Sequence, residues 1–229
     1  MHHHEEKHFT GSAIVRDMVI GLSDGLTVPF ALAAGLTGAV QSNEIIITAG
    51  LAEIVAGSIA MGLGGYLAGK TEIEHYDSEL KREYDEVEQF PEREKQEVRE
   101  VFEEYGLSDH STEVIVEEMA KDKEKWVHFM MRFELGLEKP DINRARQSAL
   151  TIGLSYIAGG FVPLSSYFFT DTASSGLFYS CIVTSMCLFL FGYLKSKIIG
   201  QPPLAGAIRI TAIGALAAAS AYYVAHLIS

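Results

Sequence analysis

Long apolar runs alternate with one polar stretch along this chain, and the pattern predicts five membrane-spanning helices. Each run is long enough to cross a bilayer, which takes about 20 mostly apolar residues in a helix. We expect the spans at about residues 11–40, 44–69, 147–169, 174–194 and 203–228. The chain is therefore expected to be an all-α membrane protein.

The polar stretch between the second and third spans predicts a soluble insert of three helices. The first continues out of the second span to about Gln89. Pro91 suits the first turn of a second helix, and Gly106 suits its C-terminal cap. Ser108 or Asp109 can cap a third helix, which is expected to run to about Leu137.

Four segments follow from this pattern. Residues 1–10 are interpreted as an expression-tag remnant, because the chain starts Met-His-His-His, followed by an N-terminal tail. Residues 11–70 are expected to form the first two transmembrane helices, 71–141 the helical insert, and 142–229 the last three transmembrane helices.

Charge is concentrated in the insert. Between Glu72 and Asp141 there are 23 acidic and 10 basic residues, whereas the rest of the chain has 7 acidic and 8 basic residues. An acidic surface of this kind repels nucleic acid and attracts cations. We therefore expect cations, and no nucleic acid, as partners of the insert.

Basic residues predict the orientation of the spans. They border the insert and the last loop, whereas residues 41–44 and 170–173 contain none. By the positive-inside rule, the insert and the N-terminus are expected in the cytosol and the C-terminus across the membrane. Five is an odd number of spans, so an internal two-fold repeat is not expected, and a homodimer is the natural way to build a pathway. The basic residues are Lys70, Arg144, Arg146, Lys195, Lys197 and Arg209.

Two carboxylates lie inside apolar spans. Asp24 is in the middle of the first span and Glu53 is in the second. Ionisable groups at this depth are costly and mark ion or proton pathways. The alternative is a buried carboxylate that only accepts hydrogen bonds between helices. Pro29 removes one backbone hydrogen bond within about a turn of Asp24, which loosens the helix there or simply kinks it.

Small residues recur at four-residue spacing in the first two spans, which is typical of close helix packing in membranes. The pairs are Gly21/Gly25, Ala31/Gly35, Ala34/Gly38 and Gly65/Gly69. Met61 lies among the glycines of the second span. Taken alone, it is more typical of packing than of a metal ligand.

The insert offers a constellation of possible metal ligands. Glutamates three residues apart share one face of a helix, and two methionines precede another glutamate by three and four residues. Carboxylates suit hard divalent cations, and a thioether shifts the preference towards transition metals. These residues are the pairs Glu83/Glu86 and Glu94/Glu97, with Met130, Met131 and Glu134.

The alternative for each acidic pair is a solvated helix face. In a segment this acidic the spacing recurs by chance, and Glu100/Glu103 cannot be told apart from Glu83/Glu86. Glu72-x-x-His75 has the spacing used in di-iron bundles but occurs once, whereas those sites need two such motifs. We therefore do not predict an oxidase or any other enzyme.

Three stretches resemble the vacuolar iron transporter family, and its plant members most. They are Asp24-Gly25-Leu26-Thr27-Val28-Pro29, the segment from Glu53 to Gly69 that contains Met61, and Gly159-Gly160-Phe161-Val162-Pro163. Together with five spans and an acidic insert between the second and third, the resemblance covers nearly the whole chain.

The resemblance implies a homodimer in the vacuolar membrane that moves ferrous iron from cytosol to vacuole in exchange for protons. Asp24 and Met61 would line the path near the dimer interface, and Glu53 matches an acidic position of the second span. The C-terminus would be lumenal and the insert a cytosolic metal-binding domain. No prosthetic group is implied, and Zn²⁺, Co²⁺ or Mn²⁺ would substitute for Fe²⁺. The implied ligands of the insert are Glu83, Glu86, Glu94, Glu97, Met130, Met131 and Glu134.

Two alternatives to an iron transporter stay open. A manganese or zinc transporter of the same build would use the same ligand types, because oxygen and thioether sites overlap across these ions. A membrane-anchored metal buffer or sensor would use the spans only as anchors. Asp24 and Glu53 argue against that second alternative, since an anchor has no need of intramembrane carboxylates.

Overall fold

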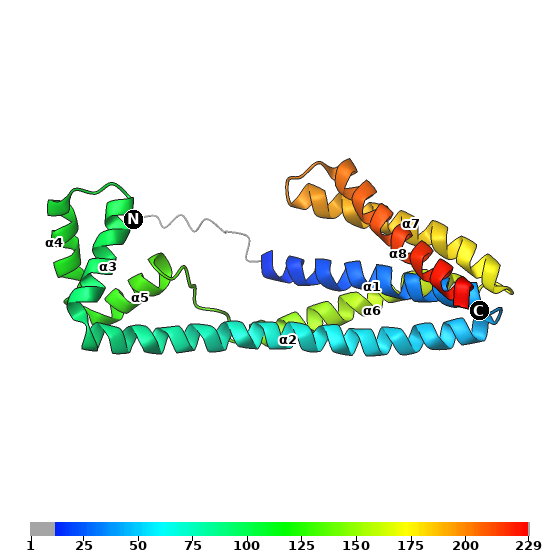
Figure 1. Ribbon diagram of the computed structural model, residues 1–229, viewed down its shortest axis with the longest axis horizontal. Coiled ribbons are helices and arrows are strands. Elements are labelled where there is room, and N and C mark those ends of the chain that lie inside the picture. The colour runs from blue at the N-terminus through cyan, green and yellow to red at the C-terminus, as the bar shows by residue number, and fades with distance from the viewer. Residues whose placement is uncertain (1–11, 229) are drawn as a thin grey trace, which may run out of the picture. The chain divides into compact units, whose positions relative to one another are not determined.

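The computed structural model describes residues 12–228, and every regular element in this range is an α-helix (Figure 1). Five helices, α1, α2, α6, α7 and α8, are long and apolar enough to cross a membrane, so the predicted all-α fold with five candidate spans is confirmed. The predicted tag remnant and tail lie outside the described residues. The helices are α1 Ser12–Ala39, α2 Asn43–Gln89, α3 Pro91–Glu104, α4 Asp109–Met119, α5 Lys123–Phe133, α6 Arg144–Phe168, α7 Ala173–Ile198 and α8 Pro203–Ile228.

The described chain forms two compact units. One contains residues 12–67 together with those from Ala145 onward, and the other contains Ala68–Arg144. The first holds the apolar helices and is called the membrane unit below. The second holds the acidic stretch and is called the insert. Helix α2 contributes its first half to the membrane unit and its second half to the insert.

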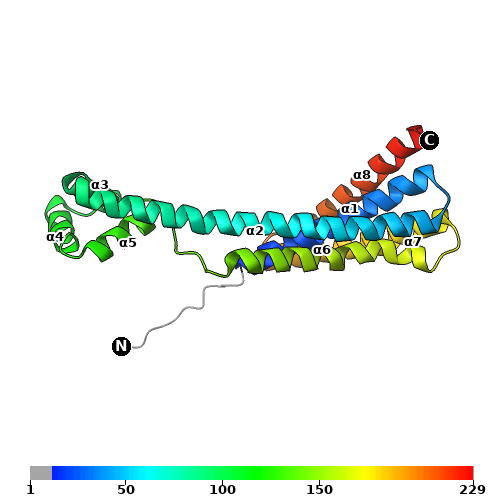
Figure 2. The ribbon, with the colours of Figure 1, turned by 90° about the horizontal axis from the view of Figure 1, so that it is seen from below.

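Glycines allow α1 and α6 to approach closely in the membrane unit, where the two helices run side by side (Figures 1 and 2). A Cβ atom on Gly21 would lie 2.8 Å from Cβ of Ser155, and one on Gly25 would lie 2.9 Å from Cα of Tyr156. Both distances are too short for a side chain. The Gly21/Gly25 pair therefore packs two spans of the same chain against each other.

A second close approach joins α1 to α8. A Cβ atom on Gly38 would lie 2.7 Å from the carbonyl oxygen of Tyr222, and one on Gly35 would lie 3.3 Å from that of Ala221. Helix α7 packs against both α1 and α8. The small residues predicted at four-residue spacing thus serve helix packing at both ends of α1.

The insert has an apolar core and the predicted helix boundaries at Pro91 and Gly106. Pro91 is the first residue of α3, and Gly106 follows the end of α3 with a φ of 77°, a conformation that favours glycine. Ser108 caps α4 by accepting a hydrogen bond from the backbone N–H of Ser111 at 3.4 Å. The buried core residues are Tyr76, Val87, Val98, Val116, Trp126, Val127, Met130 and Met131.

The prediction of one long third helix in the insert was wrong. It is divided into α4 and α5, and the break falls at residues 120–122. Asp122 has an extended backbone, and its side chain accepts a hydrogen bond from the backbone N–H of Lys125 at 3.2 Å. This cap begins a new helix, because it satisfies a donor at the start of α5. Helix α5 ends at Phe133, before the predicted end at Leu137.

Candidate functional site

Three of the predicted metal-binding glutamates meet in the insert. Glu83 and Glu86 share one face of α2, and Glu94 comes from the first turn of α3. One oxygen from each lies within 4.8 Å of the others. Oxygens bound at about 2.1–2.4 Å on opposite sides of one cation are roughly 4.2–4.8 Å apart, so one ion can contact all three. We call Glu83, Glu86 and Glu94 the glutamate cluster.

Two carboxylates of the glutamate cluster are buried without hydrogen-bond donors. Glu83 and Glu94 are each only 1% exposed. Neither oxygen of Glu94 has a hydrogen-bond partner among the described residues, and Oε2 of Glu83 lacks one as well. A buried charge without a partner is strongly unfavourable, so Glu94 must be protonated or must bind a cation. The chemistry of the cluster therefore fits a divalent metal ion.

Burial and mutual repulsion shift the acidity of these groups. Burial, followed by the charges of Glu97 and Glu83, raises the pKa of Glu94 to about 8. Burial, followed by the charge of Glu86, also raises the pKa of Glu83. Loss of hydration, followed by the charges of Glu97 and Glu83, raises the pKa of Glu134 to about 7. Metal binding near neutral pH therefore has to displace protons.

Arg82 neutralises only one edge of the glutamate cluster. Its Nε lies 3.4 Å from Oε2 of Glu86, and its Nη2 lies 3.7 Å from Oε1 of Glu83. A closer pair, at 2.7 Å, joins Nη1 to Oε2 of Glu79 outside the cluster. None of these contacts reaches Glu94, whose two oxygens have no hydrogen-bond partner in the described part of the chain. Arg82 thus leaves room for a cation on the side of Glu94.

The remaining predicted ligands lie around this cluster in different ways. Glu97 accepts a hydrogen bond from Nε of Arg93 at 3.1 Å, yet its charge still acts on Glu94 and Glu134. Met130 and Met131 are fully buried in the apolar core of the insert. The structure brings three carboxylates into one cluster and Glu97 and Glu134 within electrostatic range.

The membrane unit joins one of its two predicted carboxylates to a tyrosine. The hydroxyl of Tyr156 on α6 donates a hydrogen bond to Oε1 of Glu53 on α2, and Oε2 of Glu53 is buried without a partner among the described residues. The same tyrosine ring fills the space beside Gly57, where a Cβ would lie 2.5 Å from Cζ. Glycine at this position therefore lets the ring reach Glu53.

Asp24 lies beside the same tyrosine. Its neighbour Gly25 packs on the main chain of Tyr156, and the charge of Asp24 acts on the tyrosine hydroxyl. The hydroxyl of Tyr156 is thus hydrogen-bonded to Glu53 on α2 and lies within electrostatic range of Asp24 on α1. Met61, which is half-buried, follows Glu53 on α2 by eight residues, or about two helical turns.

Tyr156 is the polar residue of this site that the sequence reasoning missed. It is 2% exposed and lies in an apolar run where an aromatic residue is expected to pack against lipid or helices. The available signal was the need of a buried carboxylate for a donor. The tyrosine hydroxyl is such a donor.

Comparison with known proteins covers nearly the whole chain. The model of the VIT family matches residues 15–226. Vacuolar iron transporter 1 of Oryza sativa subsp. japonica is 51% identical over 227 residues, which is 99% of this chain and 90% of that protein. The Arabidopsis thaliana protein of the same name is 51% identical over 226 residues, again 99% and 90% of the two chains.

A more distant relative also matches most of this chain. Protein CCC1 of Saccharomyces cerevisiae is 37% identical over 223 residues, which is 94% of this chain and 69% of that protein. The match includes both units described above, the apolar helices and the acidic insert. With a family match of this length and plant relatives that are half identical, the chain belongs to the VIT family.

Proposed function

We propose that this chain transports ferrous iron from the cytosol into the vacuole. The observation that carries the proposal is the pair of carboxylates, Asp24 and Glu53, placed around Tyr156 inside apolar helices. Polar groups at that depth are expensive and mark ion pathways. Relatives with about half of their residues identical bear the name Vacuolar iron transporter 1, which supports iron as the cargo.

The glutamate cluster collects the metal in this proposal. Three of its buried oxygens, two on Glu94 and one on Glu83, have no donor among the described residues, so a bound cation would stabilise them. Small rearrangements of α5 and α3 would add Glu97, Glu134, Met130 and Met131 as further ligands. Thioethers among them would favour Fe²⁺ and similar ions over Ca²⁺ or Mg²⁺, with Zn²⁺, Co²⁺ or Mn²⁺ as substitutes.

Asp24 and Met61 form the transport path in a homodimer, with Glu53 beside them. The polar groups of one chain are few, and two copies would double the ligands available to one ion. Pro29, inside α1 and five residues after Asp24, leaves a backbone carbonyl without its helical donor. That carbonyl is a further oxygen for a passing cation and a point where α1 can bend.

Protons from the vacuole drive release of the metal. A carboxylate cannot hold a proton and a metal ion on the same oxygen, so metal affinity falls as the pH falls. This coupling requires the insert and the N-terminus on the cytosolic side and the C-terminus in the lumen. The basic residues that border the insert support that orientation.

A membrane-anchored metal buffer or sensor is the second candidate function. The buried glutamate cluster favours it as much as it favours a transporter, since both need a metal site in the insert. The Glu53–Tyr156 hydrogen bond favours transport, because an anchor gains nothing from a buried carboxylate in its spans.

Metal uptake into liposomes that contain the purified protein tests the proposal. Ferrous iron, manganese and zinc are supplied outside, with an acidic or a neutral interior. Uptake that requires the acidic interior, with iron transported fastest, is the expected result. Equal uptake with an acidic and a neutral interior would contradict the proposed coupling of metal transport to protons. No uptake of any ion, with metal still bound to the insert, would contradict the transporter proposal and favour the membrane-anchored buffer or sensor.

A further inference from the structure

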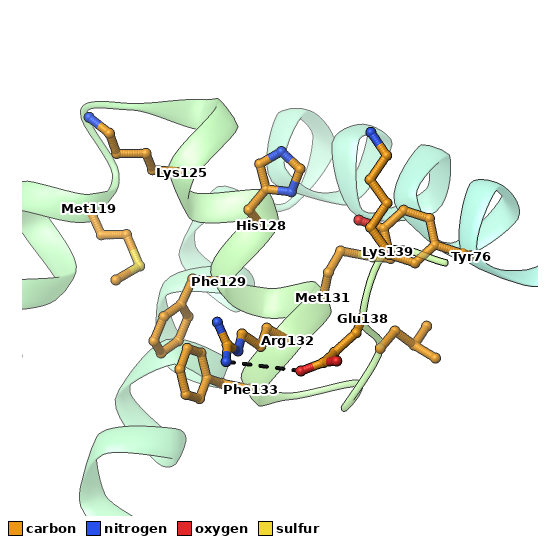
Figure 3. Close-up of a pocket in the computed structure, with 11 residues that line it drawn as sticks. Tyr76, Met119, Lys125, His128, Phe129, Met131, Arg132, Phe133, Glu138 and Lys139 are labelled. Carbon is orange, nitrogen blue, oxygen red and sulfur yellow. Dashed lines mark ion pairs between the residues drawn. The ribbon is translucent and has the colours of Figure 1, made fainter. Parts of the chain in front are cut away.

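A pocket of about 540 Å³ lies in the insert and is lined by basic and aromatic side chains (Figure 3). Its walls come from α4 and α5, from the part of α2 near Tyr76, and from the segment that follows α5. Figure 3 shows His128, Arg132 and Phe133 along α5, with Lys139 across from them. This volume is within the range of small-molecule sites, which is roughly 300–1,000 Å³.

The charge of the pocket is opposite to that of the rest of the insert. Lys125, Arg132 and Lys139 line it, together with His128, and Glu138 is the one carboxylate among the lining residues. Three of the insert's 12 lysines and arginines therefore line one cavity, together with one of its 23 acidic residues. A local excess of positive charge in an acidic domain attracts an anion to this place.

The basic side chains of the pocket are only partly occupied by acidic partners. Arg132 and Glu138 approach to 4.0 Å, at the limit of an ion pair, and Lys139 has no ion pair or hydrogen bond within the described part of the chain. Elsewhere in the insert, Arg99 holds Glu113 with two nitrogens at 2.8 and 3.2 Å. Lys125 does pair with Asp122, at 2.7 Å, but is largely exposed and can turn.

An aromatic surface lies directly beside these charges. The rings of Phe129 and Phe133 stack with centroids 4.8 Å apart, and the guanidinium of Arg132 lies 5.6 Å from the centroid of Phe133. Phe133 is half exposed, although an apolar ring of this size is usually covered. A flat ring of a ligand can stack on this surface while its acidic groups meet the basic side chains.

We propose that this pocket binds a soluble phosphorylated organic anion with an aromatic ring, of the nucleoside diphosphate class. Arginine recognises phosphate with two parallel hydrogen bonds, and lysines add point charges. The phenylalanine pair receives the base. The basic and aromatic residues that carry the proposal are not ligands in the glutamate cluster, but Met131, one of the further ligands proposed above, also lines the pocket. Binding is therefore tested without divalent metal.

Binding of ADP to the full-length protein in neutral lipid nanodiscs, without divalent metal, tests the proposal by calorimetry. Inorganic phosphate is the second probe, and vesicles that contain a phosphatidylinositol phosphate are the third. We expect saturable binding of one ADP per chain, and phosphate binding weaker by about fivefold or more, since phosphate has no ring to stack on the phenylalanine pair.

Two sets of substitutions locate the site. Lys125→Gln, Arg132→Gln and Lys139→Gln together should weaken ADP binding by about a hundredfold or more, because two or more charge-assisted hydrogen bonds are lost. The matched control combines Lys81→Gln, Arg93→Gln and Lys121→Gln, which change the net charge equally outside the pocket. Phe133→Leu should weaken ADP binding but leave phosphate binding unchanged. Fluorescence of Trp126, the one tryptophan, reports whether each variant is folded.

Four results would overturn the proposal. They are no saturable ADP binding to the wild type, equal losses in the pocket and control triple variants, an unchanged ADP affinity in Phe133→Leu, and binding of the lipid vesicles alone. The last result would mean that the basic residues of the pocket bind the headgroup of a membrane lipid and not a soluble anion. If the pocket triple variant fails to fold, Arg132→Lys is the second test. It keeps the positive charge but loses the two parallel hydrogen bonds of the guanidinium, and it should still weaken ADP binding.

Discussion

The carboxylates of the insert and those of the membrane unit are stabilised in different ways. Glu94 is buried in a group of like charges, and neither of its oxygens is hydrogen-bonded within residues 12–228. Glu53 receives a hydrogen bond from the neutral hydroxyl of Tyr156. The charge of Glu94 in the insert therefore lacks a stabilising partner among the described residues. One oxygen of Glu53 in the membrane unit, by contrast, has a hydrogen-bond donor. A site of the first kind suits capture of a cation, and one of the second suits transient contact during passage.

The largest effect is expected from Asp24→Ala, which removes the carboxylate in the middle of α1. Iron uptake into liposomes should fall by about a hundredfold, because loss of one charged ligand costs up to roughly 3 kcal/mol. Metal binding by the insert should be unchanged. Asp171→Ala, in the exposed connection between α6 and α7, is the control and should transport normally. Normal uptake by Asp24→Ala would show that Asp24 is not part of the transport path.

Glu94→Gln tests the insert side of the comparison. The substitution keeps the shape and removes the buried charge, so iron binding to the insert should weaken by about tenfold or more. The metal-free protein should become more stable at pH 8, since the unfavourable charge is gone. Glu100→Gln, on the exposed face of the same helix, should change neither property. Equal metal affinity in the two variants would show that the cluster is not the site.

Tyr156→Phe tests the membrane side with the smallest possible change. It removes one hydroxyl and leaves Glu53 without its donor. We expect iron uptake to fall by about tenfold, because an unsatisfied buried group costs roughly 1–3 kcal/mol. The ring still fills the space beside Gly57, so the fold should be kept. Tyr179→Phe, at an exposed tyrosine of α7, is the control and should transport normally. An equal loss of uptake in Tyr179→Phe would show that the effect of Tyr156→Phe does not come from the hydrogen bond to Glu53.

The smallest effect is expected on the pH dependence of stability. The pKa of Glu94 is raised to about 8 in the folded protein, and that of Glu134 to about 7, above the ordinary glutamate pKa of 4.5. A raised pKa favours the protonated folded form, so stability is full below about pH 4.5 and is lost as the pH rises towards 8.

Denaturant unfolding followed by Trp126 fluorescence measures this dependence in the insert. The metal-free insert should be less stable at pH 8 than at pH 5 by at least about 1 kcal/mol, since one pKa unit corresponds to about 1.4 kcal/mol. Added Zn²⁺ should restore stability at pH 8 more than at pH 5. The same stability at both pH values without metal would mean that the carboxylates are not in an unfavourable state.

Much of the fold follows from the sequence pattern alone. Hydropathy predicted the ends of α1, α6, α7 and α8 to within a few residues, and also the start of α2. An apolar run of about 20 residues or more is typical of a transmembrane helix. The break between α4 and α5 was missed because Lys121, Asp122 and Lys123 contain no glycine or proline. A polar residue that caps a helix looks the same in sequence as one on a solvated helix face.

The candidate site shows a similar limit. Spacing could not distinguish Glu83/Glu86 from Glu100/Glu103, whereas in the structure Glu83 is buried and Glu100 and Glu103 are exposed. The turn at Phe90, which places Glu94 against α2, decides this difference. The partnership of Glu53 with Tyr156 joins residues 103 positions apart, and no local pattern encodes a contact over that separation.

Iron uptake as a function of external iron concentration tests the division of roles most directly. Wild type, Asp24→Ala and the double variant Glu83→Gln/Glu94→Gln are compared in liposomes with an acidic interior. The account predicts no uptake by Asp24→Ala at any concentration, and uptake by the double variant that is low at low iron but approaches the wild-type maximum at high iron. Transport by Asp24→Ala, or a double variant that stays inactive at every concentration, would contradict it.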